Sequence, residues 1–142
     1  MLSKACQYAI KSLIYLAKLQ GGAKVPLKEI AEEIGSPPAF TSKILQQLVA
    51  ADVVVSSKGG HGGFELTDHA YSGLTLGEII EIMDGNELSK GCFLGLPECS
   101  CLNPCPLHDE YTDIKRKLNQ RLFAITLDEL LKKHKNEVKL KS

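Results

Sequence analysis

The sequence lacks an apolar run long enough to cross a bilayer, for which a helix needs about 20 consecutive apolar residues. Its N-terminal segment also spreads lysines among apolar residues and has no small-residue cleavage site, unlike a secretory signal peptide. These absences predict a cytoplasmic protein, in which thiols stay reduced. Clustered cysteines in such a protein bind metal or act in catalysis more often than they form cross-links.

The chain also lacks net charge and is poor in arginine. Basic and acidic residues each number 17, and this balance neither favours nor excludes a polyanionic partner, because the distribution of charge matters more than its sum. The two arginines, Arg116 and Arg121, both lie in the C-terminal third. Apolar residues make up 44% of the 142 residues, which is sufficient for the core of one domain with an appendage.

Three segments of the first half have the apolar spacing of helices. The first covers residues 5–17 and is ended by glycines at 21 and 22, and the second runs from 27 to 34 and ends at Gly35. The third begins at Ser36, which can cap a helix, continues through two prolines that suit a first turn, and reaches about Ala50. A short helix, a tight turn and a second helix indicate a helix-turn-helix.

The next residues predict a hairpin. Residues 53–55 are three valines and predict a strand, the glycine-rich "SSKGGHGG" predicts a turn, and "FEL" alternates as a second strand would. A hairpin directly after the second helix of a helix-turn-helix is the wing of a winged helix. A short loop is expected after Thr67.

The second half predicts further helices around an irregular stretch. "LTLGEIIEIMDG" forms a helix closed by Gly85, a long amphipathic helix covers about 107–125, and Thr126 with Glu129 forms the capping box of a last short helix. The tail after 135 is expected to fray. The fold class is therefore mainly α with a small β-hairpin, divided into residues 1–84, 85–106, 107–135 and 136–142.

The irregular stretch holds four of the five cysteines, at positions 92, 99, 101 and 105, followed by His108. No C-x-x-C pair is present, so a zinc ribbon or thioredoxin site is not indicated. Thiolates are the usual ligands of iron–sulfur clusters and also suit zinc. Spacing alone leaves a metal site, a reversible disulfide among Cys99, Cys101 and Cys105, and a plain loop all open. Three prolines, at 97, 104 and 106, stiffen this loop.

The order of these features resembles the Rrf2 family of bacterial transcription regulators, which includes the iron–sulfur regulator IscR and the nitric oxide sensor NsrR. The resemblance covers residues 2 to about 135, and its most specific parts are "YAIKSLIYLA", "SSKGGHGGFEL", "LTLGEIIEIMDG" and the cysteine loop with "PLH". It implies a homodimer joined through the helix at 107–125. It also implies a DNA-binding regulator whose affinity for a two-fold symmetric operator is controlled by an iron–sulfur cluster, or by redox or nitric oxide state.

The resemblance also implies a ligand set. Cys92, Cys99 and Cys105 match the three cluster cysteines, and His108 matches the histidine that completes the site in the IscR type. The NsrR type takes a carboxylate from the first helix of the partner subunit, but the matching residue here is Gln7. A 2Fe–2S cluster is therefore expected rather than a 4Fe–4S cluster. Cys101 is interpreted as a spare loop thiol and Cys6 as a buried apolar residue.

Residues of the third helix and of the wing are the candidates for contact with double-stranded DNA, because a recognition helix reads bases with side chains near its N-terminus. They are Ser36, Pro38, Ala39, Thr41, Ser42, Lys43 and Gln46 in the helix, and Lys58, Gly59, His61 and Gly62 in the wing. No arginine of this region offers the usual bidentate guanine contact, so contacts weighted toward phosphate are expected. The other interpretation makes the hydroxyls mere caps and the wing a plain hairpin.

An enzyme is not indicated, because no nucleophile, base and orienting group form a recognisable motif. The carboxylates Glu78, Glu81 and Asp84 are interpreted as a solvated helix face. Two alternatives to a cluster-controlled regulator remain at this point. One is a regulator that senses redox state through a thiol–disulfide pair, and the other is a zinc-stabilised protein-interaction module.

Overall fold

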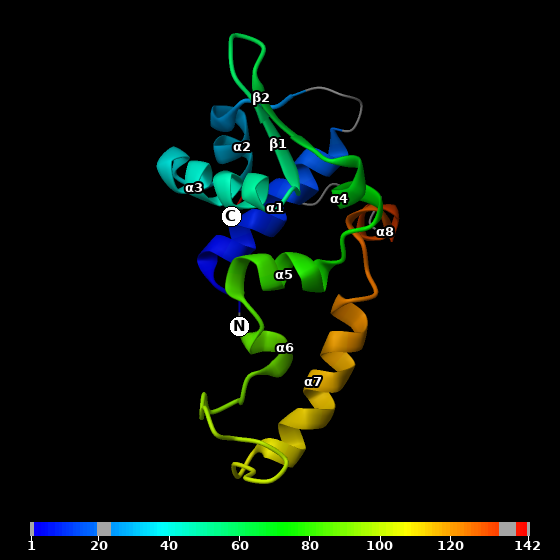
Figure 1. Ribbon diagram of the computed structural model, residues 1–142. Coiled ribbons are helices and arrows are strands. Elements are labelled where there is room, and N and C mark those ends of the chain that lie inside the picture. Colours follow the sequence, from blue (N-terminus) through cyan, green and yellow to red (C-terminus); the bar gives the residue numbers. More distant parts are fainter. Residues whose placement is uncertain (1, 20–23, 134–138, 142) are drawn as a thin grey trace.

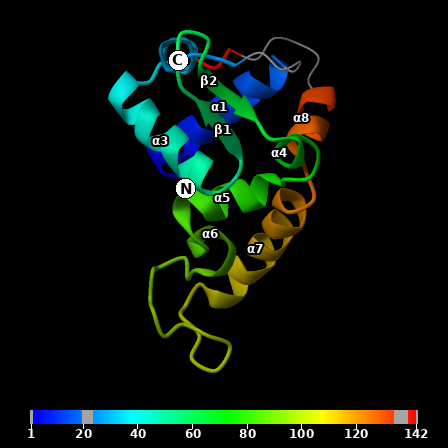
Figure 2. The ribbon, with the colours of Figure 1, turned by 45° about the horizontal axis from the view of Figure 1, so that its top comes forward.

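The computed structural model describes residues 2–19, 24–133 and 139–141, and these residues are mostly helical with one two-stranded sheet. Figure 1 shows α1 to α5, the sheet and α8 gathered in one part, from which α7 and the loop before it extend away. The turned view in Figure 2 keeps the tip of the sheet and this loop at opposite ends. The elements are α1 (Lys4–Lys18), α2 (Leu27–Ile34), α3 (Pro38–Ala50), β1 (Val54–Ser57), β2 (Gly63–Leu66), α4 (Asp68–Ser72), α5 (Leu76–Asp84), α6 (Glu87–Lys90), α7 (His108–Leu122) and α8 (Leu127–Lys133).

The helix-turn-helix packs on α1, as the apolar spacing predicts. Leu13, Ile30 and Leu45 are fully buried where α1, α2 and α3 meet. Gly35 ends α2 in the left-handed region, at φ 68°, which glycine adopts without the steric cost of a Cβ. The glycines at 21 and 22, which were expected to end the first helix, lie outside the described residues.

The start of α3 differs from the prediction. Pro37, not Ser36, is the N-cap residue, and no side chain caps the helix. Ser36 is buried, and its hydroxyl has no hydrogen-bond partner among the described residues. Proline suits this position because it has no N–H group to leave unpaired and its φ is already close to helical.

The wing is confirmed, with a third short segment added. Strands β1 and β2 pair antiparallel from Val54 opposite Leu66 to Ser57 opposite Gly63. Val25 pairs with Phe64 through two backbone hydrogen bonds of 2.9 and 2.8 Å. Gly63 permits this pairing, because a Cβ there would lie 2.6 Å from the Val25 carbonyl oxygen.

The prediction of a loop after Thr67 was wrong, because α4 begins there. The Thr67 hydroxyl accepts a hydrogen bond from the Ala70 amide at 3.2 Å and caps the helix. Helix α6 was also missed. Both helices are too short, at five and four residues, to repeat an apolar face, and repetition is the signal that periodicity detects.

Helix α7 joins the loop to the rest of the chain. Its C-terminal end meets α5 where the Phe123 ring lies over Gly77, and α8 follows with the predicted capping box between Thr126 and Glu129. None of the described residues of α7 is buried, and Ile114 is 61% exposed. The expectation of a frayed tail was wrong for Leu140, which is buried, while residues 134–138 are not described. Among the described residues, no helix has the length and apolar character needed to cross a membrane.

The contact between Gly77 and Phe123 gives the first testable prediction. A Cβ on residue 77 would lie 2.6–2.8 Å from three ring carbons of Phe123. Glycine to alanine in a helix interior normally stabilises by about 1 kcal/mol, but overpacking of this kind costs about 1–3 kcal/mol. We expect Gly77→Ala to lower the free energy of unfolding, measured in urea at a fixed protein concentration. Adding Phe123→Leu should recover most of the loss, and a Gly77→Ala protein more stable than the wild type would contradict the packing.

Candidate cluster site and DNA-binding surface

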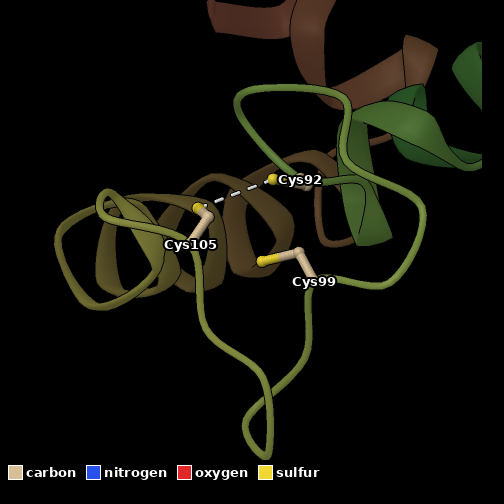
Figure 3. Close-up of side chains that lie close together, drawn as sticks. All are labelled: Cys92, Cys99 and Cys105. Carbon is tan, nitrogen blue, oxygen red and sulfur yellow. Dashed lines mark hydrogen bonds between the residues drawn. The ribbon is translucent and has the colours of Figure 1, made fainter.

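Three cysteines of the loop between α6 and α7 converge on one point. The sulfur atoms of Cys92, Cys99 and Cys105 all lie within 4.8 Å of one another, and those of Cys92 and Cys105 are 3.6 Å apart. Figure 3 shows the three side chains directed toward one another inside the loop. All three are half-buried free thiols. The loop therefore presents three soft donors to a single centre.

His108 adds a fourth donor from the first residue of α7. Its Nδ1 lies 3.3 Å from the Cys99 sulfur. The amide of His108 donates to the Cys105 carbonyl at 3.0 Å, which places the start of the helix directly beside the third cysteine. All four side chains line one cavity of about 270 Å³. The structure thus brings together the four residues that the family resemblance implied, whose role as ligands stays a prediction.

The thiols of this group differ in acidity. Hydrogen bonding from the Leu96 amide is the main cause that lowers the pKa of Cys92 to about 7, against the opposing effect of burial. For Cys99, the amide of Cys105 acts in the same direction, but burial and the two neighbouring thiols together raise its pKa. One thiolate therefore forms readily, and further thiolates repel it. A bound cation would remove this repulsion and favour all three as thiolates.

The other two cysteines stand apart from this group. Cys101 is exposed and is not among the three converging thiols. Cys6 is fully buried in α1, and burial together with the nearby Asp84 carboxylate raises the pKa of its thiol to about 12. The Gln7 side chain donates to the Leu2 carbonyl at 3.1 Å. Within the described chain these contacts give Cys6 and Gln7 local structural roles.

The candidate base-reading residues of α3 divide between surface and core. Pro38, Ala39, Lys43 and Gln46 are exposed and Ser42 is half-buried, with the Gln46 amide 3.4 Å from the Ser42 hydroxyl. Thr41 is fully buried, and its hydroxyl donates to the Pro37 carbonyl at 3.0 Å. The Thr41 hydroxyl therefore bonds back to the N-cap residue of its own helix, and Ser36 is buried just before that residue. The exposed residues stay candidates for DNA contact.

The wing presents its predicted residues to solvent. Lys58, Gly59 and His61 are exposed and Gly62 is half-buried, and Gly59 has φ 105° with open space around it. The structure adds Lys24, whose ammonium donates to the Ser57 hydroxyl at 2.6 Å at the end of β1, next to the turn of the wing. Sequence reasoning missed Lys24 because it precedes the helix-turn-helix and reaches the wing only through the pairing of Val25 with Phe64.

The α5 carboxylates are partly solvated, as predicted: Glu78 is exposed, whereas Glu81 and Asp84 are half-buried. Glu78 completes a capping box with Thr75, and Glu81 accepts from the Ser89 hydroxyl at 3.0 Å. Asp84 accepts from the Ser3 amide at 2.9 Å and also from the Ser3 hydroxyl. Glu81 and Asp84 therefore join α5 to α6 and to the start of α1.

The chain is similar along nearly its whole length to known transcription regulators. A family model described as Rrf2, iron-dependent transcriptional regulator, matches residues 2–133. A protein of Aquifex aeolicus assigned as an HTH-type transcriptional regulator is 30% identical over 92% of this chain and 91% of its own length. The HTH-type transcriptional regulator IscR of Vibrio atlanticus is 28% identical over 92% of this chain and 75% of its own. The solved structure of CymR, the global cysteine regulator of B. subtilis, superposes with a TM-score of 0.77 at 23% identity, covering 94% of this chain and 98% of that one.

Proposed function

The chain belongs to the Rrf2 family of transcriptional regulators, and on this premise we propose that it is a cytoplasmic, homodimeric DNA-binding regulator. Its affinity for an operator would follow the state of an iron–sulfur cluster held by Cys92, Cys99, Cys105 and His108. The observation that carries this proposal is the convergence of three sulfurs within 4.8 Å, with the His108 imidazole 3.3 Å from one of them. We assign residues 1–84 to DNA binding, 85–106 to the cluster loop, 107–135 to the dimerisation helix and a short C-terminal helix, and 136–142 to a tail.

The donor set fits a 2Fe–2S cluster chemically. Three thiolates and one imidazole are ligands of such clusters, and the position where a partner's carboxylate would be expected holds Gln7 instead. When bound, the cluster supplies a group that can accept an electron and that oxidants can destroy. The loop residues hold it, and the first turn of α7 begins within the ligand set at His108. The similarity to IscR supports the choice of an iron–sulfur cluster.

Dimerisation would cover the surface of α7. This helix has fifteen residues without a buried side chain, and its Ile114 is 61% exposed. A long helix with an unpartnered apolar stripe is stabilised when a second copy packs on it. Two copies related by a two-fold axis would then present two copies of α3 and of the wing to successive half-sites of the operator.

The test is purification without oxygen from cells supplied with iron. We expect a coloured protein with about two irons and two acid-labile sulfides per protomer, the composition of a 2Fe–2S cluster. Its operator, selected from genomic fragments by gel shift, should bind with an affinity that changes about 5–150-fold when the cluster is removed. A colourless protein with neither iron nor sulfide, whose DNA binding ignores the loss of Cys92, contradicts the proposal.

A second candidate is a site for one tetrahedral metal ion, because the sulfurs are close together. Zinc–sulfur bonds of about 2.3 Å hold the sulfurs of one tetrahedral ion roughly 3.8 Å apart, near the 3.6 Å between Cys92 and Cys105. A two-iron cluster divides its ligands between two metals, so the loop would have to open. The same preparation separates the candidates, since a single-ion site yields about one zinc per protomer and no sulfide.

The short distance between Cys92 and Cys105 also favours this pair for thiol chemistry. The sequence pointed to Cys99, Cys101 and Cys105 as disulfide partners, but Cys101 is exposed and outside the group. Cys92 and Cys105 could join by losing two protons and two electrons to a peroxide, beginning from Cys92, whose pKa is lowered to about 7. A thiol count that falls by two with peroxide in metal-free protein, together with changed operator affinity, would identify this form of control.

A further inference from the structure

Three residues of α7, spaced four apart, contact the chain on both sides of Cys92. The Tyr111 ring faces the Phe93 ring, with centroids 5.1 Å apart. The Lys115 ammonium donates to the Gly91 carbonyl at 3.2 Å and to the Lys90 carbonyl at 3.5 Å. The Asn119 side chain donates to the Ser89 carbonyl at 2.9 Å. Because residues four apart share one face of a helix, Tyr111, Lys115 and Asn119 form a continuous clamp, which we call the α7 clamp.

The clamp meets the DNA-binding part of the chain at Ser89. The Ser89 carbonyl accepts from Asn119 on α7, and the Ser89 hydroxyl donates to Glu81 on α5 at 3.0 Å. At the end of α5, Asp84 accepts from the Ser3 amide, and Ser3 caps α1. A continuous set of hydrogen bonds and one turn of helix therefore connects the segment before Cys92 to the first helix.

Lys115 occupies the central position in the clamp. It is half-buried, lies 5.5 Å from the centroid of the Tyr111 ring, and lines the same cavity as the four donor side chains. Hydrogen bonds from an ammonium group are stronger than those between neutral groups. The side-chain oxygen Oδ1 of Asn119 is buried without a partner among the described residues, at a cavity of about 10 Å³, near the size of one water. The hydrogen bonding of this buried side chain is therefore directed to Ser89 through its NH₂ group.

We propose that the α7 clamp couples the cluster loop to α7, with Lys115 as the positioning residue. A shift of Cys92 toward or away from the ligand centre moves Gly91 and Phe93, which Lys115 and Tyr111 hold against the helix. The shift thereby reaches the helix that joins the two protomers. This inference rests on the proposed function, and it assigns two tasks to different residues. The four ligands hold the cluster, and the α7 clamp transmits a change in the cluster to the DNA-binding part of the dimer.

The test replaces Lys115 by methionine, which keeps an unbranched stem over Tyr111 and removes the donor. For each variant, the affinity for the selected operator is measured with the cluster bound and removed, and the ratio of the two is the coupling. We expect Lys115→Met to keep its iron within about twofold of wild type, while the coupling falls by about tenfold or more, toward a ratio of one. Lys115→Arg retains a cationic donor and should restore most of the coupling. Lys133→Met, at an exposed residue of α8, is the matched control and should leave the coupling unchanged.

Reduction potential and hydrogen exchange provide readouts that a general loss of stability would not reproduce. Removing a positive charge from the cavity should lower the reduction potential in Lys115→Met and leave it unchanged in Asn119→Ala. In metal-free protein, Lys115→Met should speed amide exchange at Lys90, Gly91 and Gly95 by about tenfold, and Lys133→Met should not.

The outcomes distinguish the clamp from the proposed function. A Lys115→Met protein with wild-type coupling overturns the clamp and leaves cluster control standing. A wild-type protein that binds no cluster overturns the proposed function. The α7 clamp is then tested by amide exchange in metal-free protein alone, and unchanged exchange at Lys90, Gly91 and Gly95 in Lys115→Met overturns the clamp.

Discussion

Replacing Cys105 by alanine is expected to abolish cluster binding. The Cys105 sulfur lies 3.6 Å from that of Cys92, and its carbonyl accepts the His108 amide, so this residue meets two of the other three candidate ligands. Loss of a partner outside the ligand set typically lowers metal affinity about 10–100-fold, and loss of a ligand itself costs more. Protein prepared without oxygen should therefore lose more than about nine-tenths of its iron and its visible absorption.

Cys101→Ala is the matched control, because Cys101 lies in the same loop, is exposed, and is outside the converging group. It should keep its iron and its operator affinity. Cys105→Ala should bind the operator as the cluster-free wild type does, because the substitution removes the cluster and leaves α3 and the wing intact. If instead Cys101→Ala loses the iron and Cys105→Ala keeps it, the ligand set proposed here is wrong and the loop closes differently around the metal.

The three cysteines and His108 show how far sequence can lead to a site. The cysteine spacing placed these residues in one loop. A loop without periodicity does not predict which side chains face one another, so the spacing was compatible with a metal site, a disulfide or a plain loop. The family resemblance selected Cys92, Cys99, Cys105 and His108, and the structure places these four together. The partners of α7 were out of reach, because Lys115 and Asn119 contact main-chain carbonyls, which carry no sequence signal.

The helices followed the sequence where an apolar face repeats. Helix α2 begins at Leu27 as predicted, and α5 begins at Leu76, two residues after the start of the predicted segment. Gly35 and Gly85 end these two helices, also as predicted. The burial of Thr41 could have been predicted from the sequence. Leu45 follows Thr41 by four residues and Leu48 follows Leu45 by three, so all three lie on one face of α3 and are buried together. Counting Thr41 within the apolar face of α3, instead of among its polar residues, would have placed its hydroxyl against the helix backbone.

Replacing Lys58 in the wing by alanine is expected to weaken operator binding strongly at low salt. Lys58 is exposed among glycines at the tip of the wing, where the backbone can approach a phosphate closely. In a two-fold symmetric dimer, one substitution removes two phosphate contacts. Each contact contributes about −0.9 to the slope of log affinity against log salt, so the slope should become less steep by about 1.8. At 50 mM salt, this difference in slope corresponds to an operator affinity roughly a hundredfold lower in Lys58→Ala than in the wild type.

The salt dependence distinguishes phosphate contact from base reading. A lysine that contacts only phosphate lowers affinity about equally for the operator and for unrelated DNA, whereas a lysine that contacts a base edge lowers the preference for the operator. Lys133→Ala is the control, because Lys133 lies on α8, outside α3 and the wing, and the substitution removes the same charge from an exposed position. It should leave the slope within experimental error. A Lys58→Ala protein with an unchanged slope would show that Lys58 does not contact the DNA backbone. The phosphate contacts would then have to come from Lys43 on α3 or from Lys24 beside the end of β1.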